Sequence, residues 1–134
     1  MKQLFKQALA AAALAGAAFG VQAQVAVVMG SSAAPLTKDQ VANIYLGRAF
    51  DLKPVDLPDG SPVRDQFYKK ATDRDAAQVK AVWSRVVFSG KGQAPKELPD
   101  AAAVKKAVAA DPKAIGYIEK SAVDGSVKEV LTLN

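Results

Sequence analysis

The sequence predicts an α/β domain in which a mixed, mostly parallel sheet is flanked by helices. Apolar runs with strand character alternate with amphipathic helical segments, and strong helix caps and turn residues separate them. No internal repeat or low-complexity segment interrupts residues 24–134. About four strands and four helices in alternating order require a sheet whose faces are covered by helices.

The first half of this domain is marked by clear turn and cap signals. Residues 25–29 form a β-branched apolar run, which is typical of a buried strand. Thr37 is a helix N-cap, and Gly47 is suited to ending that helix. A second strand is expected within residues 50–57, where Pro54 favours an edge position or a strand start.

The middle of the chain predicts two consecutive helices. Ser61 caps the first, which extends to about Ala71. An N-cap at Thr72–Asp73 starts the second, longer helix, which ends near Ser89–Gly90. Its expected buried face consists of Val79, Val82, Trp83, Val86 and Val87.

The last third predicts one helix and two strands. Asp100 is the expected cap of the helix, and Asp111–Pro112 ends it. Residues 114–118 form a strand in which Gly116 indicates close approach of another segment. Residues 127–133 form the last strand.

The first 23 residues predict a secretory signal peptide. Lysines near the start are followed by an apolar run over residues 8–20 and by small residues before Gln24. This run is shorter than the about 20 apolar residues of a membrane span, so no stable membrane insertion is expected after cleavage. We therefore expect a periplasmic protein whose mature part is a single domain over residues 24–134.

Composition argues against most enzyme classes. The chain has no His and no Cys, which removes Ser-His triads, thiolate chemistry and the commonest metal ligand. Carboxylates cluster only at Asp56 with Asp59 and at Asp73 with Asp75, where turns and helix caps account for them. We expect no enzyme activity, no metal and no cofactor. The net charge of +5 comes from dispersed Lys and Arg, so nucleic-acid binding is not expected either.

The start of the helix at Ser61 is the main candidate binding site. Gly60 tolerates the positive φ of a turn, Ser61 offers a hydroxyl, and Val63 and Arg64 carry backbone N–H groups in the first helical turn. The Arg64 guanidinium is unfavourable there unless an anion lies nearby. These features predict a small-oxyanion site, the alternative being an ordinary Ser-Pro helix start.

A second candidate follows the first strand. Ser31 and Ser32, after Gly30, offer hydroxyl and N–H donors. Loops that follow strands bind ligands in open α/β sheets, so these serines are a second oxyanion candidate. The alternative is an ordinary loop.

Four stretches, taken in order, give the chain a family resemblance. Residues 36–47 contain L-T-K-D-Q-V and then I-Y-L-G, residues 59–67 contain D-G-S and then Phe67, Trp83 precedes F-S-G, and Pro112 precedes A-I-G-Y-I. This pattern resembles the phosphate-binding components of ABC transporters, in the type II periplasmic binding protein superfamily. The resemblance implies a three-layer, periplasmic-binding-protein-like lobe. It also implies a solute-binding-like protein for phosphate or another small oxyanion, linked to ABC-type phosphate uptake.

The departures from the family pattern leave a second function open. Leu57 stands where the family has an anion-binding Arg, Pro62 has no N–H, and Val63 replaces a Thr. The length suffices for one lobe of a two-lobed protein, so a homodimer, an envelope transporter or a receptor would have to cover the ligand. The alternative is a non-catalytic envelope interaction module that has lost ligand binding. Whether Ser61 and Arg64 converge on one donor-rich surface distinguishes the two.

Overall fold

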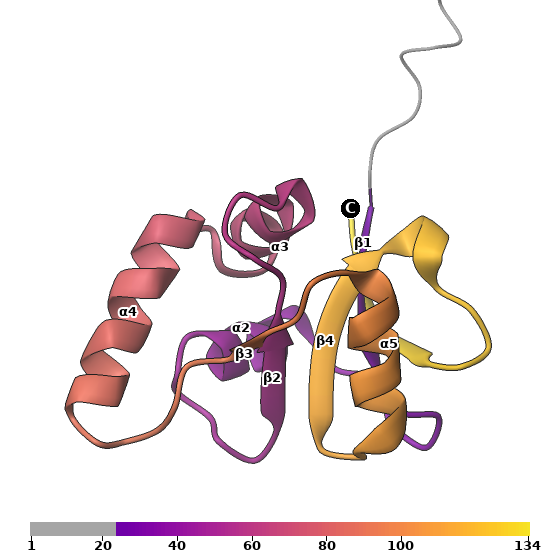
Figure 1. Ribbon diagram of the computed structural model, residues 1–134, viewed down its shortest axis with the longest axis horizontal. Coiled ribbons are helices and arrows are strands. Elements are labelled where there is room, and N and C mark those ends of the chain that lie inside the picture. Colours follow the sequence, from indigo (N-terminus) through magenta and orange to yellow (C-terminus); the bar gives the residue numbers. More distant parts are fainter. Residues whose placement is uncertain (1–23) are drawn as a thin grey trace, which may run out of the picture.

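The computed structural model describes residues 24–134, and the expected signal peptide at residues 1–23 lies outside them. In this described part of the chain, five strands form one sheet in the order β3-β2-β4-β1-β5 (Figure 1). β1 (Val25–Met29) lies antiparallel between β4 (Ala114–Glu119) and β5 (Lys128–Leu133). β1 matches the predicted first strand residue for residue.

The other half of the sheet is parallel. β2 (Lys53–Asp56) pairs with β4 on one side and with the two-residue β3 (Lys96–Glu97) on the other. Within the described sheet, β1 therefore runs antiparallel to the other four strands, which all run in the same direction. This arrangement is the mixed, mostly parallel sheet that the sequence predicts.

Within residues 24–134, four α-helices, each with a side-chain N-cap, flank the sheet. They are α2 (Lys38–Tyr45), α3 (Pro62–Thr72), α4 (Ala76–Phe88) and α5 (Ala101–Ala110), and a short 3₁₀ turn, η2 (Lys120–Ala122), follows β4. The predicted caps at Thr37, Ser61 and Asp100 are confirmed.

The predicted cap at Thr72–Asp73 is wrong. Asp73 takes the left-handed conformation, with φ 58°, and ends α3. Asp75 has the extended backbone that an N-cap needs and accepts from the Gln78 N–H at 2.8 Å, so α4 begins two to three residues later than expected.

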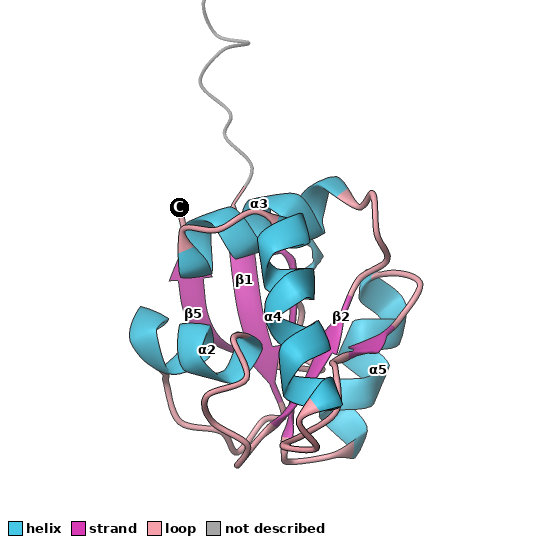
Figure 2. Ribbon diagram, turned by 90° about the vertical axis from the view of Figure 1, so that its left-hand side faces the viewer, coloured by secondary structure: helices cyan, strands magenta, loops and turns pink. Residues whose placement is uncertain are grey.

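The two faces of the sheet are covered by different helices, as Figure 2 illustrates. A Cβ on Gly116 would lie 2.5 Å from Val104 of α5. The next residue, Tyr117, stacks on Phe67 of α3, with ring centroids 3.9 Å apart. Because neighbouring residues of a strand point to opposite faces, α5 covers one face and α3 the other.

A cluster of aromatic rings fills the space between the sheet and the helices α2 and α3. Tyr45, Phe67, Tyr68 and Tyr117 are all buried. The Tyr45 hydroxyl lies inside the core, where it donates to the Val55 carbonyl at 2.8 Å. Buried hydroxyls of this kind need such partners.

Helix α4 lies at one side of the molecule, away from α5 (Figure 1). Val79 and Trp83 are buried, and the Trp83 indole donates to the Tyr45 carbonyl at 2.8 Å. The prediction that Val87 is buried is wrong, since its exposed fraction is 49%. α4 packs against α3.

Within residues 24–134, no helix combines the length and the apolar character needed to cross a membrane.

Candidate functional site

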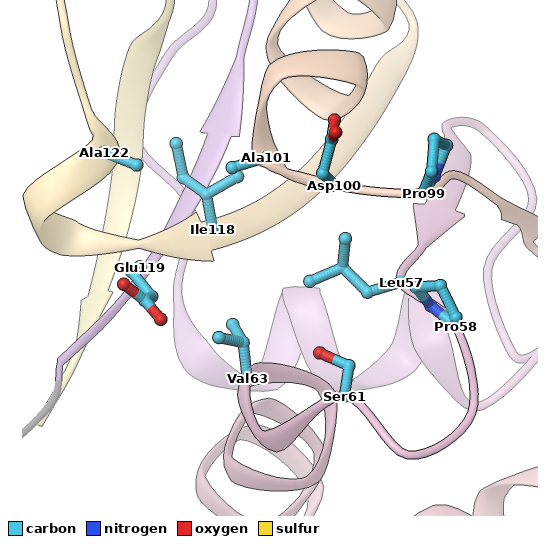
Figure 3. Close-up of a pocket in the computed structure, with 10 residues that line it drawn as sticks. All are labelled: Leu57, Pro58, Ser61, Val63, Pro99, Asp100, Ala101, Ile118, Glu119 and Ala122. Carbon is cyan, nitrogen blue, oxygen red and sulfur yellow. The ribbon is translucent and has the colours of Figure 1, made fainter.

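A cavity of about 380 Å³ lies where β2 and β4 end and where α3 and α5 begin. Figure 3 shows the side chains around it, most of which are apolar. Two carboxyl-bearing residues, Asp100 and Glu119, also line it. The cavity is formed by Leu57, Pro58, Ser61, Val63, Pro99, Asp100, Ala101, Ile118, Glu119 and Ala122.

The turn before α3 has the predicted local structure. Gly60 has φ 86°, and the Ser61 N–H donates to the Pro58 carbonyl at 3.1 Å. The Ser61 hydroxyl accepts from the Arg64 N–H at 3.3 Å, as an N-cap does. The Val63 N–H has no intrahelical partner at this position, and no other acceptor reaches it among residues 24–134.

The Arg64 side chain, by contrast, is surrounded by acceptors of the chain itself. Its exposed fraction is 6%. Nη1 donates to the Leu57 carbonyl and to Glu97 Oε1, both at 2.8 Å, and Nη2 lies 3.3 Å from Asp59 Oδ1. Nε lies 3.8 Å from Asp56 Oδ1 and makes no hydrogen bond among the described residues.

Asp56 is the buried carboxylate of this network. It accepts hydrogen bonds from the hydroxyls of Tyr68 and Tyr117 and from the Leu57 N–H, the last at 2.9 Å. Burial raises the pKa of Asp56, while the hydrogen bonds from Tyr117 and Tyr68 and the charge of Arg64 act in the opposite direction. Burial and the Asp56 carboxylate also raise the pKa of both tyrosines.

Burial on its own would lower the pKa of Arg64, but the charge of Asp56 and the hydrogen bond to Glu97 raise it. The guanidinium is therefore charged, and the three carboxylates around it supply the counter-charge. The expectation that an anion accompanies Arg64 is thus met by side chains of the chain. The sequence analysis assigned Asp56 to a turn and did not single out Glu97. Their pairing with Arg64 was missed, because it depends on the arrangement of β2 and β3 beside α3.

Ser61 and Arg64 do not converge on one surface. Ser61 lines the apolar cavity at the start of α3 and α5. Arg64 lines a separate cavity of about 300 Å³, together with Lys80, Asp56 and Glu97. Neither cavity presents the hydroxyl and the guanidinium to one ligand.

Ser31 and Ser32 lie at the far end of the domain from Ser61. They are exposed in the turn after β1. A Cβ on the preceding Gly30 would lie 3.2 Å from the Val108 carbonyl, near the end of α5, whereas the cavity beside Ser61 adjoins Ala101 at its start. About seven residues of helix, roughly 10 Å, separate the two places, so the two candidates form no common site.

The remaining carboxylate cluster has a local structural role. Asp73 ends α3 and Asp75 caps α4. Among the described residues, no group of acidic side chains is arranged to hold a metal ion.

Comparison with solved structures gives the fold its context. The chain superposes on an ABC-type phosphate transport receptor from Vibrio cholerae with a TM-score of 0.64 and 20% identity, over 81% of this chain and 46% of the receptor. The fold is that of part of a phosphate transport receptor. The match has the size of a single lobe, as the family resemblance implied.

A second solved structure agrees. A protein described as a phosphate ABC transporter substrate-binding protein, from Clostridium perfringens and with bound phosphate, matches with a TM-score of 0.61 and 23% identity. That match covers 81% of this chain and 44% of the other. The chain thus spans less than half the length of either protein. Comparisons with family models and with curated sequences find no match.

Proposed function

We propose that this protein is a non-catalytic interaction module of the bacterial cell envelope, which keeps the binding-protein fold but does not hold phosphate at Ser61 and Arg64. Residues 1–23 support a location in the cell envelope, because they have the pattern of a secretory signal peptide whose removal leaves a single mature domain in the periplasm. The fold of the transport receptors supports a role beside a transporter or receptor.

The single observation that carries the proposal is the state of Arg64. Its guanidinium is buried and already paired with Asp56, Asp59 and Glu97. An incoming oxyanion would have to displace a carboxylate that the fold holds in place, and it would meet the negative charge of the others. The cavity beside Ser61 adds Asp100 and Glu119, which also disfavour an anion.

One observation favours a second function, the binding of phosphate or another small oxyanion in ABC-type uptake. The Val63 N–H and the Ser61 hydroxyl lie at the start of α3, where the helix dipole favours an anion. In a single lobe this site is open to solvent, and each exposed charge pair would contribute only about 0–1 kcal/mol to the free energy of binding. Tight binding would therefore need a second copy of the chain or a transporter to cover the site.

Calorimetric titration separates the two functions. We would titrate residues 24–134 with inorganic phosphate, and with sulfate in parallel, at low salt. The proposal expects no saturable heat with either anion from a protein whose circular dichroism shows that it is folded.

Saturable phosphate binding that weakens in Ser61→Ala would contradict the proposal and establish the oxyanion function. Gly125→Ala is the matched control, because a Cβ at that position meets no atom within 4 Å. Binding that survives in both variants would place the anion elsewhere and would equally contradict the loss of ligand binding.

A further inference from the structure

Large apolar side chains are exposed at one end of the described domain. Phe88 has an exposed fraction of 95%, Phe50 of 51% and Val87 of 49%. We call these three residues the apolar tip. The other large apolar side chains of residues 24–134 are buried or partly buried.

The three residues lie near the same loop, which follows α4. The turn after α4 folds back on the helix, since the Gly90 N–H donates to the Val87 carbonyl at 3.0 Å and the Lys91 N–H to the Val86 carbonyl at 3.2 Å. Phe50, from the segment between α2 and β2, packs on this turn, because a Cβ on Gly92 would lie 2.6 Å from its ring. Figure 1 shows the end of α4 and the following loop at one side of the molecule.

Two exposed cations, Arg85 and Lys91, flank Phe88 in the chain. Neither of them forms an ion pair within residues 24–134. Other lysines of the described chain are paired, as Lys105 is with Asp124 at 2.8 Å. Asp51 is the acidic residue that follows Phe50 in the chain, so the charge at this end remains positive.

The size of the apolar tip bears on what it binds. A fully buried aromatic side chain removes about 150–250 Å² from water, so the exposed parts of these three side chains offer on the order of 300–400 Å². A standard protein interface takes about 800 Å² from each partner. A lipid interface requires no such shaped surface, because protruding apolar side chains enter it while cations contact the headgroups.

We propose that the apolar tip docks the protein on an anionic membrane surface. Phe50 and Phe88 enter the interfacial region, and Arg85 and Lys91 contact lipid phosphates. This inference rests on the proposed function, since it names the surface on which the interaction module docks.

Vesicle sedimentation tests the proposal. The protein would be mixed with vesicles of phosphatidylcholine, or of phosphatidylcholine with phosphatidylglycerol, at low and at physiological salt. We expect binding to the anionic vesicles and not to the neutral ones, and we expect salt to weaken it.

Two variants examine the two parts of the surface. Arg85→Ala with Lys91→Ala should weaken binding by about thirtyfold, at the usual contribution of a surface cation near anionic lipid. Phe88→Ser should weaken it by at least about tenfold. The matched charge control is Lys69→Ala with Lys106→Ala. These two lysines are exposed on α3 and α5, and their loss should weaken vesicle binding several-fold less than the loss of Arg85 and Lys91.

The proposal is overturned if neither vesicle binds, if neutral vesicles bind equally well, or if the control pair loses as much binding as the tip pair. A dimer in sedimentation velocity that Phe88→Ser abolishes would also overturn it, because a second copy would then cover the tip. If the protein does not bind vesicles, the proposed loss of phosphate binding is unaffected. If phosphate titration gives saturable heat, the proposed function is refuted, but the vesicle result stands.

Discussion

Among the described residues, Arg64 and Asp56 are the charged side chains that are buried. Each compensates the charge of the other inside the fold. Moving a charge out of water is costly, and a buried ion pair offsets this cost only when hydrogen bonds satisfy its members. Asp56 has two tyrosine hydroxyls and a backbone N–H, and Arg64 has the Leu57 carbonyl and Glu97. Removing one member therefore leaves an uncompensated charge inside the fold.

We expect Arg64→Ala to lower the free energy of unfolding by about 3–5 kcal/mol, because Asp56 is left buried without its counter-charge. Urea denaturation followed by circular dichroism measures this loss. Lys80→Ala is the control: its pair with Asp59, at 3.1 Å, is exposed, so its loss should cost only about 0–1 kcal/mol. Similar losses in the two variants would refute a special role for the buried pair.

At this scale, the sequence indicated that Arg64 needs an anion but not which one. A cation in the first turn of a helix opposes the helix dipole, and this is visible in the printed residues. The partners come from β2, the following turn and β3, which lie up to 33 residues away from Arg64 along the chain. No local pattern marks Glu97 as a partner, so the anion was expected from outside.

The contact between β4 and α5 shows how elements fix one another. Gly116 is buried in β4, and the side chains of Val104 and Val55 fill the space where a Cβ would stand. Sequence reasoning predicted this close approach from a glycine inside a strand, and the structure confirms it. The missing side chain lets α5 lie close to the sheet.

We expect Gly116→Ala to destabilise the protein by about 1–3 kcal/mol, since its Cβ would lie 2.5 Å from one valine methyl and 2.9 Å from another. Thermal or urea denaturation measures the change. In the control, Gly125→Ala, the new methyl group has free space and stability should change by no more than about 1 kcal/mol. A harmless Gly116→Ala would mean that α5 moves away without cost.

Most elements could be predicted because each carries its own local signal. Thr37, Ser61 and Asp100 cap helices by side-chain hydrogen bonds that need only the next three residues. The strand β3 has no such signal, because two residues gain their conformation from pairing with β2. The exposure of Phe88 also depends on tertiary structure: it lies about 140° around the helix from the buried Trp83.

At the scale of the whole molecule, charge pairs on the surface link stability to pH. Hydrogen bonds from Lys105 and Ser126 lower the pKa of Asp124, and a hydrogen bond from Lys80 lowers that of Asp59. A carboxyl whose pKa is lowered by folding contributes stability above its unfolded pKa of about 3.9, and this is lost as the pH falls through the folded value. Asp56 affects the pH dependence of stability in the opposite direction. Its pKa is raised by burial, so the folded state binds a proton at Asp56 more readily than the unfolded state does.

We expect Asp124→Asn to be less stable than the wild type at pH 7, and the difference to shrink as the pH falls below about 4. Urea denaturation of both proteins across this range measures it. The difference should also shrink in high salt, because both side chains of the pair with Lys105 are partly exposed. A difference that does not change with pH would contradict an ionic contribution and point to the neutral hydrogen bonds with Ser126.

The class of the fold follows from the order of elements, but the assembly of the site does not. Alternating strands and helices predict a sheet covered on both faces, as observed. The strand order and the reversed direction of β1 require long-range pairing, and they place Ser31 and Ser32 at the opposite end of the domain from Ser61. The two candidate oxyanion sites of the sequence therefore lie at opposite ends of the domain.

The position of β1 also sets the order in which the chain can fold. The strand nearest the N-terminus of the described chain pairs with the two strands nearest its C-terminus, Val25 with both Glu119 and Leu133. Contacts of such long sequence separation make folding slow, because the loop must close before they contribute. The sheet therefore cannot be completed until β4 and β5 have left the ribosome. Until then both edges of β1 lack the strands with which it pairs.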